Sequence, residues 1–253
     1  MQVLVTGGAG YIGSVLIPML LDKGYEVKCL DRFFFGKETL NDVMSNPNLE
    51  LIKDDIRWFN PKILKGVDAV VDLAALSNDP SGELDPSKTF DINYLGRVRV
   101  AKLSKEYGVK RYILASSCSV YGFQDVILDE KSPTNPLTTY AKSNLMAEKD
   151  VLQLSDSSFT VTVLRQATVY GLSPRMRFDL AINGMVLGLF KDKKIPVMRN
   201  GEQWRPFIHI KDTSKAFLLV MESSEDKVDG ETFNTGSNDQ NYQILPLAQM
   251  IGE

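Results

Sequence analysis

The stretch TGGAGYIG, residues 6–13, decides the fold of this chain. It follows a short β-rich run, QVLVT at 2–6, and opens an apolar-periodic stretch that ends at Gly24. Glycines let a backbone approach a pyrophosphate closely, and the N-terminus of the following helix offers free N–H groups and a positive dipole end. The loop is therefore predicted to bind a dinucleotide through Gly7, Gly10, Tyr11, Ile12 and Gly13.

An acidic residue, Asp31, ends the next β-rich run, YEVKCLD at 25–31. A carboxylate there suits the hydroxyls of an adenosine ribose and would repel a 2′-phosphate. This favours NAD over NADP as the cofactor, although the neighbouring Arg32 could accept such a phosphate. We include both residues in the predicted cofactor site.

Strand and helix patterns alternate along most of the chain. Runs typical of buried strands follow at 49–55, 68–75, 111–117 and 159–165. Helical patterns occupy 85–107 and 139–154. Such alternation predicts βαβ units around a parallel sheet. The expected fold class is therefore α/β, a Rossmann-type doubly wound parallel sheet.

The spacing of the elements changes after about Gly171, and later strand patterns are short. We therefore expect an NAD-binding Rossmann domain and a smaller, C-terminal substrate lobe. The domain is assigned residues 1–172 with roughly 203–222, and the lobe residues 173–202 and 223–253. The helical pattern at 244–253 stops near its start, which suggests a truncated lobe.

Composition narrows the function classes. The 253 residues carry a net charge of −3, which argues against nucleic acid as the main partner. No run of about 18 apolar residues and no signal-like start is present, so we expect a cytoplasmic protein without a membrane span. The two cysteines, Cys29 and Cys118, are expected to be reduced thiols. Because His209 is the only histidine, neither a metal site nor a Ser-His-Asp triad is expected.

Further motifs occur in a characteristic order: DDIR at 54–57, LAA at 73–75, Asn93-x-x-Gly96, SSCSVYG at 116–122, YAKS at 140–143 and RPFIHIKD at 205–212. With TGGAGYIG, they resemble the extended short-chain dehydrogenase/reductase family, specifically its NAD-dependent nucleotide-sugar epimerases and dehydratases. The resemblance covers nearly the whole chain, and the motifs are similar to those of UDP-glucose 4-epimerases. It implies a nucleotide-sugar substrate and a homodimer.

The resemblance also implies roles for individual residues. Ser117 would hydrogen-bond the sugar hydroxyl that is oxidised, and Tyr140 would take its proton. The remaining implied cofactor contacts are Asp55, Ile56, Leu73, Ala74, Ala75 and Asn93. The implied substrate contacts, besides Ser117 and Tyr140, are Asn183 and Arg205, and a guanidinium suits a diphosphate because it binds phosphate oxygens in pairs.

One position departs from the family pattern Tyr-x-x-x-Lys. The lysine would stand one helical turn after Tyr140, where this chain has Asn144, and Lys142 lies on another face of the helix. A free tyrosine titrates near pH ~10, and a nearby cation lowers that pKa toward the range useful for a general base. Asn144 carries no charge, which leaves the nicotinamide ring as the only obvious cation. We therefore expect NAD binding to survive and turnover to be impaired.

The residues after Ser117 bear on the reaction. Dehydratases of the family carry an Asp-Glu pair after their active-site Thr, and Cys118 and Ser119 occupy those positions here. This favours 4-epimerisation through a transient 4-keto sugar over dehydration. The alternatives that stay open are an NAD(P)-dependent nucleotide-sugar 4-ketoreductase or dehydratase, and a non-catalytic dinucleotide-binding protein. The sequence predicts neither the nucleotide nor the sugar.

Overall fold

The computed structural model describes residues 1–77, 79–198 and 200–253. Its strands are β1 (Gln2–Thr6), β2 (Glu26–Asp31), β3 (Leu49–Lys53), β4 (Ala69–Asp72), β5 (Arg111–Ser117), β6 (Thr160–Gln166), β7 (Thr168–Tyr170), β8 (Trp204–His209), β9 (Thr232–Thr235) and β10 (Asn241–Gln243). Its α-helices are α1 (Gly13–Asp22), α2 (Asp79–Leu84), α3 (Pro86–Phe90), α4 (Arg97–Glu106), α5 (Thr139–Leu152), α6 (Ala181–Asp192), α7 (Ile210–Glu222), α8 (Glu225–Val228) and α9 (Ile244–Gly252). Short 3₁₀ segments are η1 (Glu38–Val43), η2 (Pro61–Leu64) and η4 (Cys118–Tyr121), and η3 (Asp91–Gly96) is a π-helix. Among these helices none is both long enough and apolar enough to span a bilayer.

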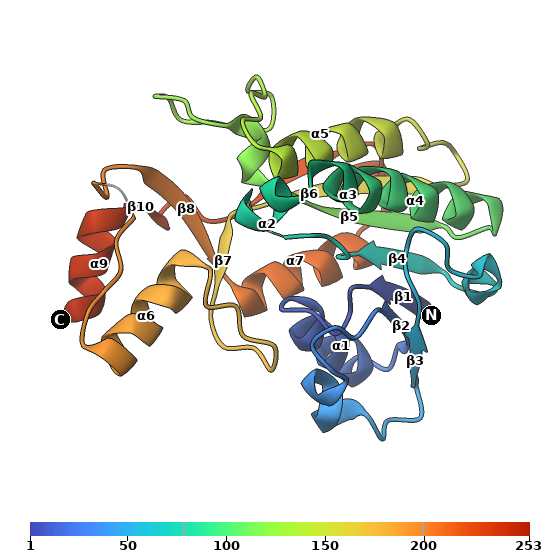
Figure 1. The fold of residues 1–253 in the computed structure, drawn as a ribbon. Helices are drawn as coiled ribbons and strands as arrows, with labels where there is room; N and C mark the ends of the chain where they lie inside the picture. The colour runs from blue at the N-terminus through green and yellow to red at the C-terminus, as the bar shows by residue number, and fades with distance from the viewer. Residues whose placement is uncertain (78, 199) are drawn as a thin grey trace.

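A parallel sheet forms the centre of the described structure, with strand order β3-β2-β1-β4-β5-β6-β9. This order confirms the predicted α/β, Rossmann-type fold. The chain builds outward from β1 to β3 and then starts again beside β1 with β4 (Figure 1). Open α/β sheets bind ligands at the carboxyl ends of the strands where the order reverses. The glycine loop after β1 and the loop after β4 meet at this point.

Helices cover both faces of the sheet (Figure 1). Successive side chains of a strand point to opposite faces, so one strand contributes to two cores. Val3 and Val5 of β1 pack in the core that contains residues of α1 and α7. Leu4, between them, packs in the opposite core with residues of α4 and α5. The near-continuous hydrophobicity of these strands follows from this double burial.

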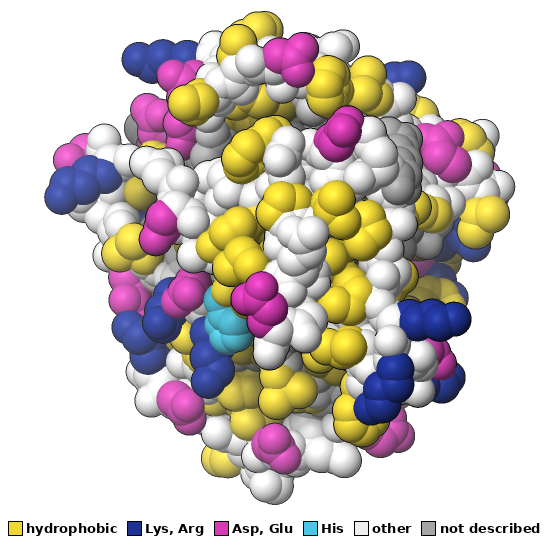
Figure 2. Space-filling model, turned by 90° about the vertical axis from the view of Figure 1, so that its left-hand side faces the viewer, with side chains coloured by type: hydrophobic (Ala, Val, Ile, Leu, Met, Phe, Trp, Pro, Cys, Tyr) yellow, Lys and Arg dark blue, Asp and Glu magenta, His cyan; other side chains and the backbone are white. Residues whose placement is uncertain are grey.

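The smaller lobe contains the strands β7, β8 and β10 with the helices α6 and α9. Its core is built around Met185, Phe207 and Leu247, which are almost completely buried. Figure 2 looks onto this side of the molecule, where hydrophobic side chains lie exposed among charged ones. The sequence-based division assigned all of 223–253 to the lobe, whereas β9 hydrogen-bonds beside β6 and completes the large sheet. It also assigned the residues of β7 and β8 to the Rossmann domain, whereas these strands pair in the smaller sheet with β10.

The helical pattern predicted over 85–107 forms as three segments. α3 and α4 are separated by the π-helical η3, whose wider turn changes the direction in which the following side chains point. Gly96 ends η3, and a Cβ there would lie 3.0 Å from Cδ1 of Ile56. This close approach brings the first turn of α4, including Arg97, into the space behind β4 and β5.

A matched pair of glycines tests the close contact between the two loops. Gly7 and Gly24 both have positive φ, +65° and +80°, so alanine at either position should cost about 1–2 kcal/mol of folding free energy. A Cβ on Gly7 would also lie 2.9 Å from the backbone N of Ala74, whereas Gly24 has nothing within 4 Å. We expect Gly7→Ala to lower the urea-unfolding free energy by about 1–3 kcal/mol more than Gly24→Ala. Equal losses would show that the loops do not depend on this contact.

Candidate active site

The glycine loop is folded back on itself at the carboxyl end of β1. Gly7 N donates to Leu30 O at 2.8 Å, and Gly10 N donates to Gly7 O at 3.0 Å. A Cβ on Gly13 would lie 2.5 Å from Cα of Gly8, so a larger residue would push the loop away from α1. Ile12, next to Tyr11, is the N-cap of α1. This tight backbone at a helix N-terminus fits the pyrophosphate of a dinucleotide.

Asp31 lies beside that loop. Its Oδ2 accepts from Ala9 N at 3.1 Å, and its Oδ1 accepts from Phe33 N at 2.7 Å. Burial raises the pKa of Asp31, and these backbone donors oppose the rise. Arg32 is directed away, because its Nη1 donates to Asp55 Oδ2 at 2.5 Å. An acidic group without a free arginine next to it suits a ribose diol better than a 2′-phosphate.

Asp55 and Ile56 follow β3. Burial raises the pKa of Asp55, but hydrogen bonds with Arg57 and Arg32 outweigh burial and hold the pKa well below its ordinary value. The carboxylate is therefore ionised and fixes both guanidinium groups, with Arg57 Nη2 at 2.8 Å from Oδ2. Ile56 is 5% exposed and packs in the core under the helix layer.

Asn93 lies behind the loop formed by Leu73, Ala74 and Ala75. It is completely buried, and its amide binds both backbone groups of Leu76, donating to O at 2.9 Å and accepting from N at 2.8 Å. Asn93 therefore fixes the backbone of this loop at Leu76. The predicted cofactor contacts Ala74 and Ala75 directly precede that residue.

Ser117 and Tyr140 come together from distant parts of the chain. Ser117 is the last residue of β5, and Tyr140 is the second residue of α5. Ser117 lies close enough to Tyr140 for its hydroxyl to lower the pKa of the phenol. Gly82 of α2 packs against this tyrosine, since a Cβ on Gly82 would lie 3.3 Å from the Tyr140 Cβ. The structure thus brings together the pair that the sequence predicts.

The first turn of α5 is held by side chains of α2. Thr138 caps α5, accepting from Ala141 N at 3.1 Å and donating to Asp79 Oδ1 at 2.6 Å. Glu83 accepts from Thr139 N at 2.6 Å. These bonds satisfy donors that a helix start otherwise leaves unpaired, and they fix the backbone from which Tyr140 projects.

Opposing influences act on the pKa of Tyr140. Burial is the largest and raises it. The charges of Arg97 and Arg177 and the hydrogen bond with Ser117 lower it, and Asp79 raises it. Burial prevails in the ligand-free chain, so the phenol is protonated at neutral pH, and the two arginines are the groups that favour its ionised form.

The structure corrects one expectation about Asn144. The sequence left the nicotinamide as the only obvious cation near Tyr140, but Asn144 Oδ1 accepts from Arg97 Nη1 at 2.7 Å. Arg97 and Asn144 are each only 1% exposed. The amide Nδ2 of Asn144 donates to Tyr140 O at 2.9 Å. A buried guanidinium therefore lies one hydrogen bond away from the turn that carries the tyrosine.

Arg97 also pairs with Asp72, which is completely buried at the end of β4. Its Nε lies 3.8 Å from Asp72 Oδ2 and has no hydrogen-bond partner among the described residues. Asp72 instead accepts hydroxyl hydrogen bonds from Thr6, at 2.5 Å, and from Tyr112. Thr6 opens the glycine loop, so one buried network connects that loop to α5.

The predicted substrate contacts lie toward the smaller lobe. Arg205 of β8 is exposed, its Nη1 donates to Trp204 O at 2.9 Å, and its charge lowers the pKa of the Cys118 thiol. Asn183 of α6 is buried, donates to Tyr11 Oη and to Arg177 O at 3.0 Å each, and accepts from Gly171 N at 3.0 Å. Asn183 thereby ties the lobe to the glycine loop.

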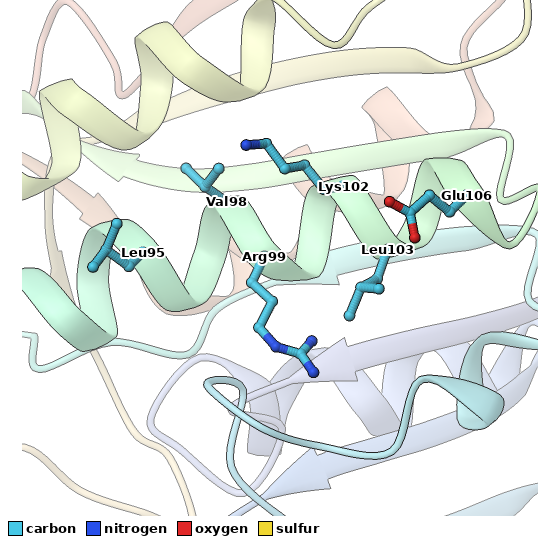
Figure 3. A pocket seen from close by; sticks show the side chains of 6 residues that line it. All are labelled: Leu95, Val98, Arg99, Lys102, Leu103 and Glu106. Atoms are coloured by element: carbon cyan, nitrogen blue, oxygen red, sulfur yellow. The ribbon is translucent and has the colours of Figure 1, made fainter.

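A shallow hollow on the outer face of α4 lies apart from these residues. Figure 3 shows the side chains around it, which all come from α4 and the end of η3: Leu95, Val98, Arg99, Lys102, Leu103 and Glu106. Every predicted site residue is absent from this lining. The hollow is therefore a surface feature of the helix layer, distinct from the site at the strand ends.

Comparison with known proteins agrees with this geometry. Residues 3–236 match the model of the NAD dependent epimerase/dehydratase family. A Methanocaldococcus jannaschii protein provisionally named UDP-glucose 4-epimerase is 30% identical over 96% of this chain and 81% of its own length. The crystal structure of UDP-glucuronic acid 4-epimerase from Bacillus cereus, in complex with UDP-glucuronic acid and NAD, has a TM-score of 0.89 at 26% identity, covering 99% of this chain and 82% of the other.

The chain belongs to the NAD-dependent epimerase/dehydratase family, an enzyme family of nucleotide-sugar chemistry. Its members differ in reaction. UDP-glucuronic acid decarboxylase 1 of Arabidopsis thaliana is 30% identical over the whole chain, which spans 58% of that enzyme's length. The family resemblance stated from the motifs is confirmed, and so is NAD as the cofactor of the family.

Sequence reasoning did not include Arg97 or Asp72 in the site. A signal for Arg97 was present: it lies three, four and seven positions before Val100, Ala101 and Ser104, which are all buried. A charged residue on the buried face of a helix needs a partner or a function. Asp72, inside an apolar strand, gave the same kind of signal.

Asp31 provides a direct test of the predicted cofactor site. We expect Asp31→Asn to weaken NAD binding about tenfold or more, because a hydrogen bond to a charged group is worth about 1.5–3 kcal/mol, and to reduce the preference for NAD over NADP. Isothermal titration with both dinucleotides measures the two effects. Asp22→Asn, on an exposed residue at the end of α1, is the matched control and should bind as the parent chain does. An unchanged affinity in Asp31→Asn would remove Asp31 from the site.

Proposed function

We propose that the chain is an NAD-dependent nucleotide-sugar 4-epimerase whose substrate is a UDP-sugar. The observation that carries this proposal is the Ser117–Tyr140 pair, brought together by the end of β5 and the first turn of α5, with two arginines that lower the pKa of the tyrosine. UDP is favoured because the relatives named above act on or bind UDP-sugars. The proposed homodimer rests on the family resemblance alone.

The roles follow from the chemistry of the pair. Tyr140 Oη takes the proton of the sugar C4 hydroxyl, and Ser117 Oγ hydrogen-bonds the same oxygen. NAD, when bound, supplies the oxidation and later the reduction of that carbon. After the keto sugar presents its other face, Tyr140 returns the proton. A positioned acid–base group of this kind contributes about 10²–10⁴-fold to a rate.

The environment of Cys118 argues against dehydration. Elimination of water needs a further acid and base, and the residues after Ser117 are Cys118 and Ser119. Burial raises the pKa of the Cys118 thiol to about 11, so the thiol stays protonated and inert at neutral pH. Ser119 Oγ is buried without a hydrogen-bond partner among the described residues. Neither side chain offers the acid–base pair that dehydration requires.

The two-lobed arrangement supports a division of labour. We assign NAD to the large sheet, which runs from β3 to β9, and the nucleotide sugar to the space between this sheet and the smaller lobe. Arg205, exposed on β8, is suited to the diphosphate, since its guanidinium can bind two phosphate oxygens. Arg177 faces the same tyrosine from the lobe side.

The impairment expected from Asn144 rested on the lack of a nearby cation. Arg97 is a cation within hydrogen-bond distance of Asn144. We therefore propose that the enzyme is active and that Asn144 positions Arg97 relative to the helical turn of Tyr140.

The activity is tested by NMR on a panel of UDP-sugars that includes UDP-glucose and UDP-glucuronic acid. We expect inversion at C4 of at least one sugar, and Tyr140→Phe should slow it about a hundredfold or more while NAD still binds. Tyr25→Phe, whose hydroxyl donates to Glu222 at 2.7 Å on the surface, is the control and should turn over normally. Loss of the sugar carboxyl carbon, net use of NADH, or no change in any sugar would contradict the 4-epimerase proposal.

A further inference from the structure

Asn144 faces the interior, where both ends of its amide are engaged. The side chain is 1% exposed, Oδ1 accepts from Arg97 Nη1 at 2.7 Å, and Nδ2 donates to Tyr140 O at 2.9 Å. The amide thus joins two things: a buried guanidinium and the backbone of the turn that carries Tyr140. An asparagine is well suited to this task, because its oxygen accepts and its nitrogen donates.

We propose that Arg97 supplies the positive charge that the lysine supplies in Tyr-x-x-x-Lys enzymes, and that Asn144 holds the guanidinium against the first turn of α5. Arg97 is buried and contacts Asn144, so we assign it no contact with the substrate or the cofactor. Its role is to influence the ionisation of Tyr140, which makes it a positioning residue. A guanidinium stays charged over the whole working range of proteins, so this charge is constant with pH. The inference rests on the proposed function, in which Tyr140 accepts a proton.

The charge of Arg97 is only partly neutralised by Asp72. The two groups approach no closer than 3.8 Å, between Nε and Oδ2. Asp72 accepts hydroxyl hydrogen bonds from Thr6 and Tyr112, which stabilise the carboxylate independently of the arginine. The Nη atoms of Arg97 donate to Asn144 Oδ1 and to the backbone carbonyls of Ala115 and Asp72, not to the Asp72 carboxylate. The guanidinium therefore presents its positive end toward α5 and the end of β5.

Other charged groups face Tyr140 from the surrounding elements. Asp79 of α2 disfavours the phenolate, and Arg177 from the loop before α6 favours it. Arg177 forms an ion pair with Asp179, whose Oδ2 lies 2.6 Å from Arg177 Nη2 and whose side chain is 41% exposed. The carboxylate and the solvent therefore weaken the effect of the Arg177 charge on Tyr140. Arg97 is enclosed by protein, where a charge acts more strongly than in water. Of the two arginines, Arg97 has the larger effect on the tyrosine.

The test measures the ionisation of Tyr140 directly. Tyrosines are labelled with ¹³C at Cζ, the Tyr140 resonance is assigned by its loss in Tyr140→Phe, and its chemical shift is followed with pH in the NAD-loaded protein. The variants are Arg97→Gln, Arg97→Lys, Asn144→Lys and the double variant Arg97→Gln with Asn144→Lys. The last one moves the buried charge to the family position and keeps one cation in the buried network that contains Asp72.

We expect Arg97→Gln to raise the midpoint of the Tyr140 titration by about one pH unit or more. The rise of kcat/KM with pH should move upward with it, because a general base must be deprotonated, and the rate at pH 7 should fall about tenfold or more. Arg97→Lys and the double variant should both return the titration and the rate toward the parent values. If Arg97→Gln alone fails to fold because Asp72 loses its cation, the double variant carries the comparison.

Asn144→Lys by itself distinguishes this proposal from an impaired enzyme. With Arg97 present, the added lysine places two cations in one buried space, so we expect lower stability and no gain in rate. A faster Asn144→Lys enzyme with a lower tyrosine midpoint would overturn the proposal. So would a folded Arg97→Gln with an unchanged Tyr140 titration, or a folded double variant whose titration is not restored. The NMR titration needs no turnover, so its result stands apart from the outcome of the sugar assay.

Discussion

A buried guanidinium beside a buried carboxylate holds the two halves of this site in register. Taking such charges out of water costs several kcal/mol per ion, and only good partners on every side offset that cost. Asp72 takes its partners from the glycine loop and from β5, through Thr6 and Tyr112, and Arg97 takes its partners from β5 and from α5. A shift of any of these elements would leave a charge unpaired, so the glycine loop and α5 have one relative position.

The same helix makes polar contacts along one whole face. Tyr140, Asn144 and Glu148 recur every four residues and therefore lie above one another on α5. Tyr140 meets Ser117, Asn144 meets Arg97, and Glu148 accepts from Ser116 and from Arg165. Ala147 and Val151 of the same helix pack in the apolar core. These polar contacts fix the position of α5 along its own axis. A purely apolar interface, which is not directional, would hold that position less strictly.

The fold could be predicted because its signals are local, and the central pair could be predicted because the order of several short motifs carries the family resemblance. Glycine spacing, strand–helix alternation and the four-residue step from Tyr140 to Asn144 are all contained in short stretches. The partner of Asn144 could not be read in this way, because Arg97 lies 47 residues earlier and reaches it only through the packing of α4 against α5. The π-helical η3 that directs Arg97 inward left no recognisable pattern in the helical stretch. For the same reason β9 was assigned to the wrong lobe: a strand of Thr232–Thr235 shows no preference between two sheets until its neighbours are known.

The hydrogen bond between Arg97 and Asn144 also makes substitutions at the two positions depend on each other. Moving the buried charge from position 97 to position 144 takes two substitutions. A chain that carries only one of them has either two buried cations or none. Asp72 makes these two chains unequal, because a carboxylate that is completely buried tolerates a surplus of positive charge better than its absence. Substitutions at the two positions are therefore not expected to be additive, and the order in which they are made decides whether the intermediate chain has a surplus or a lack of buried positive charge.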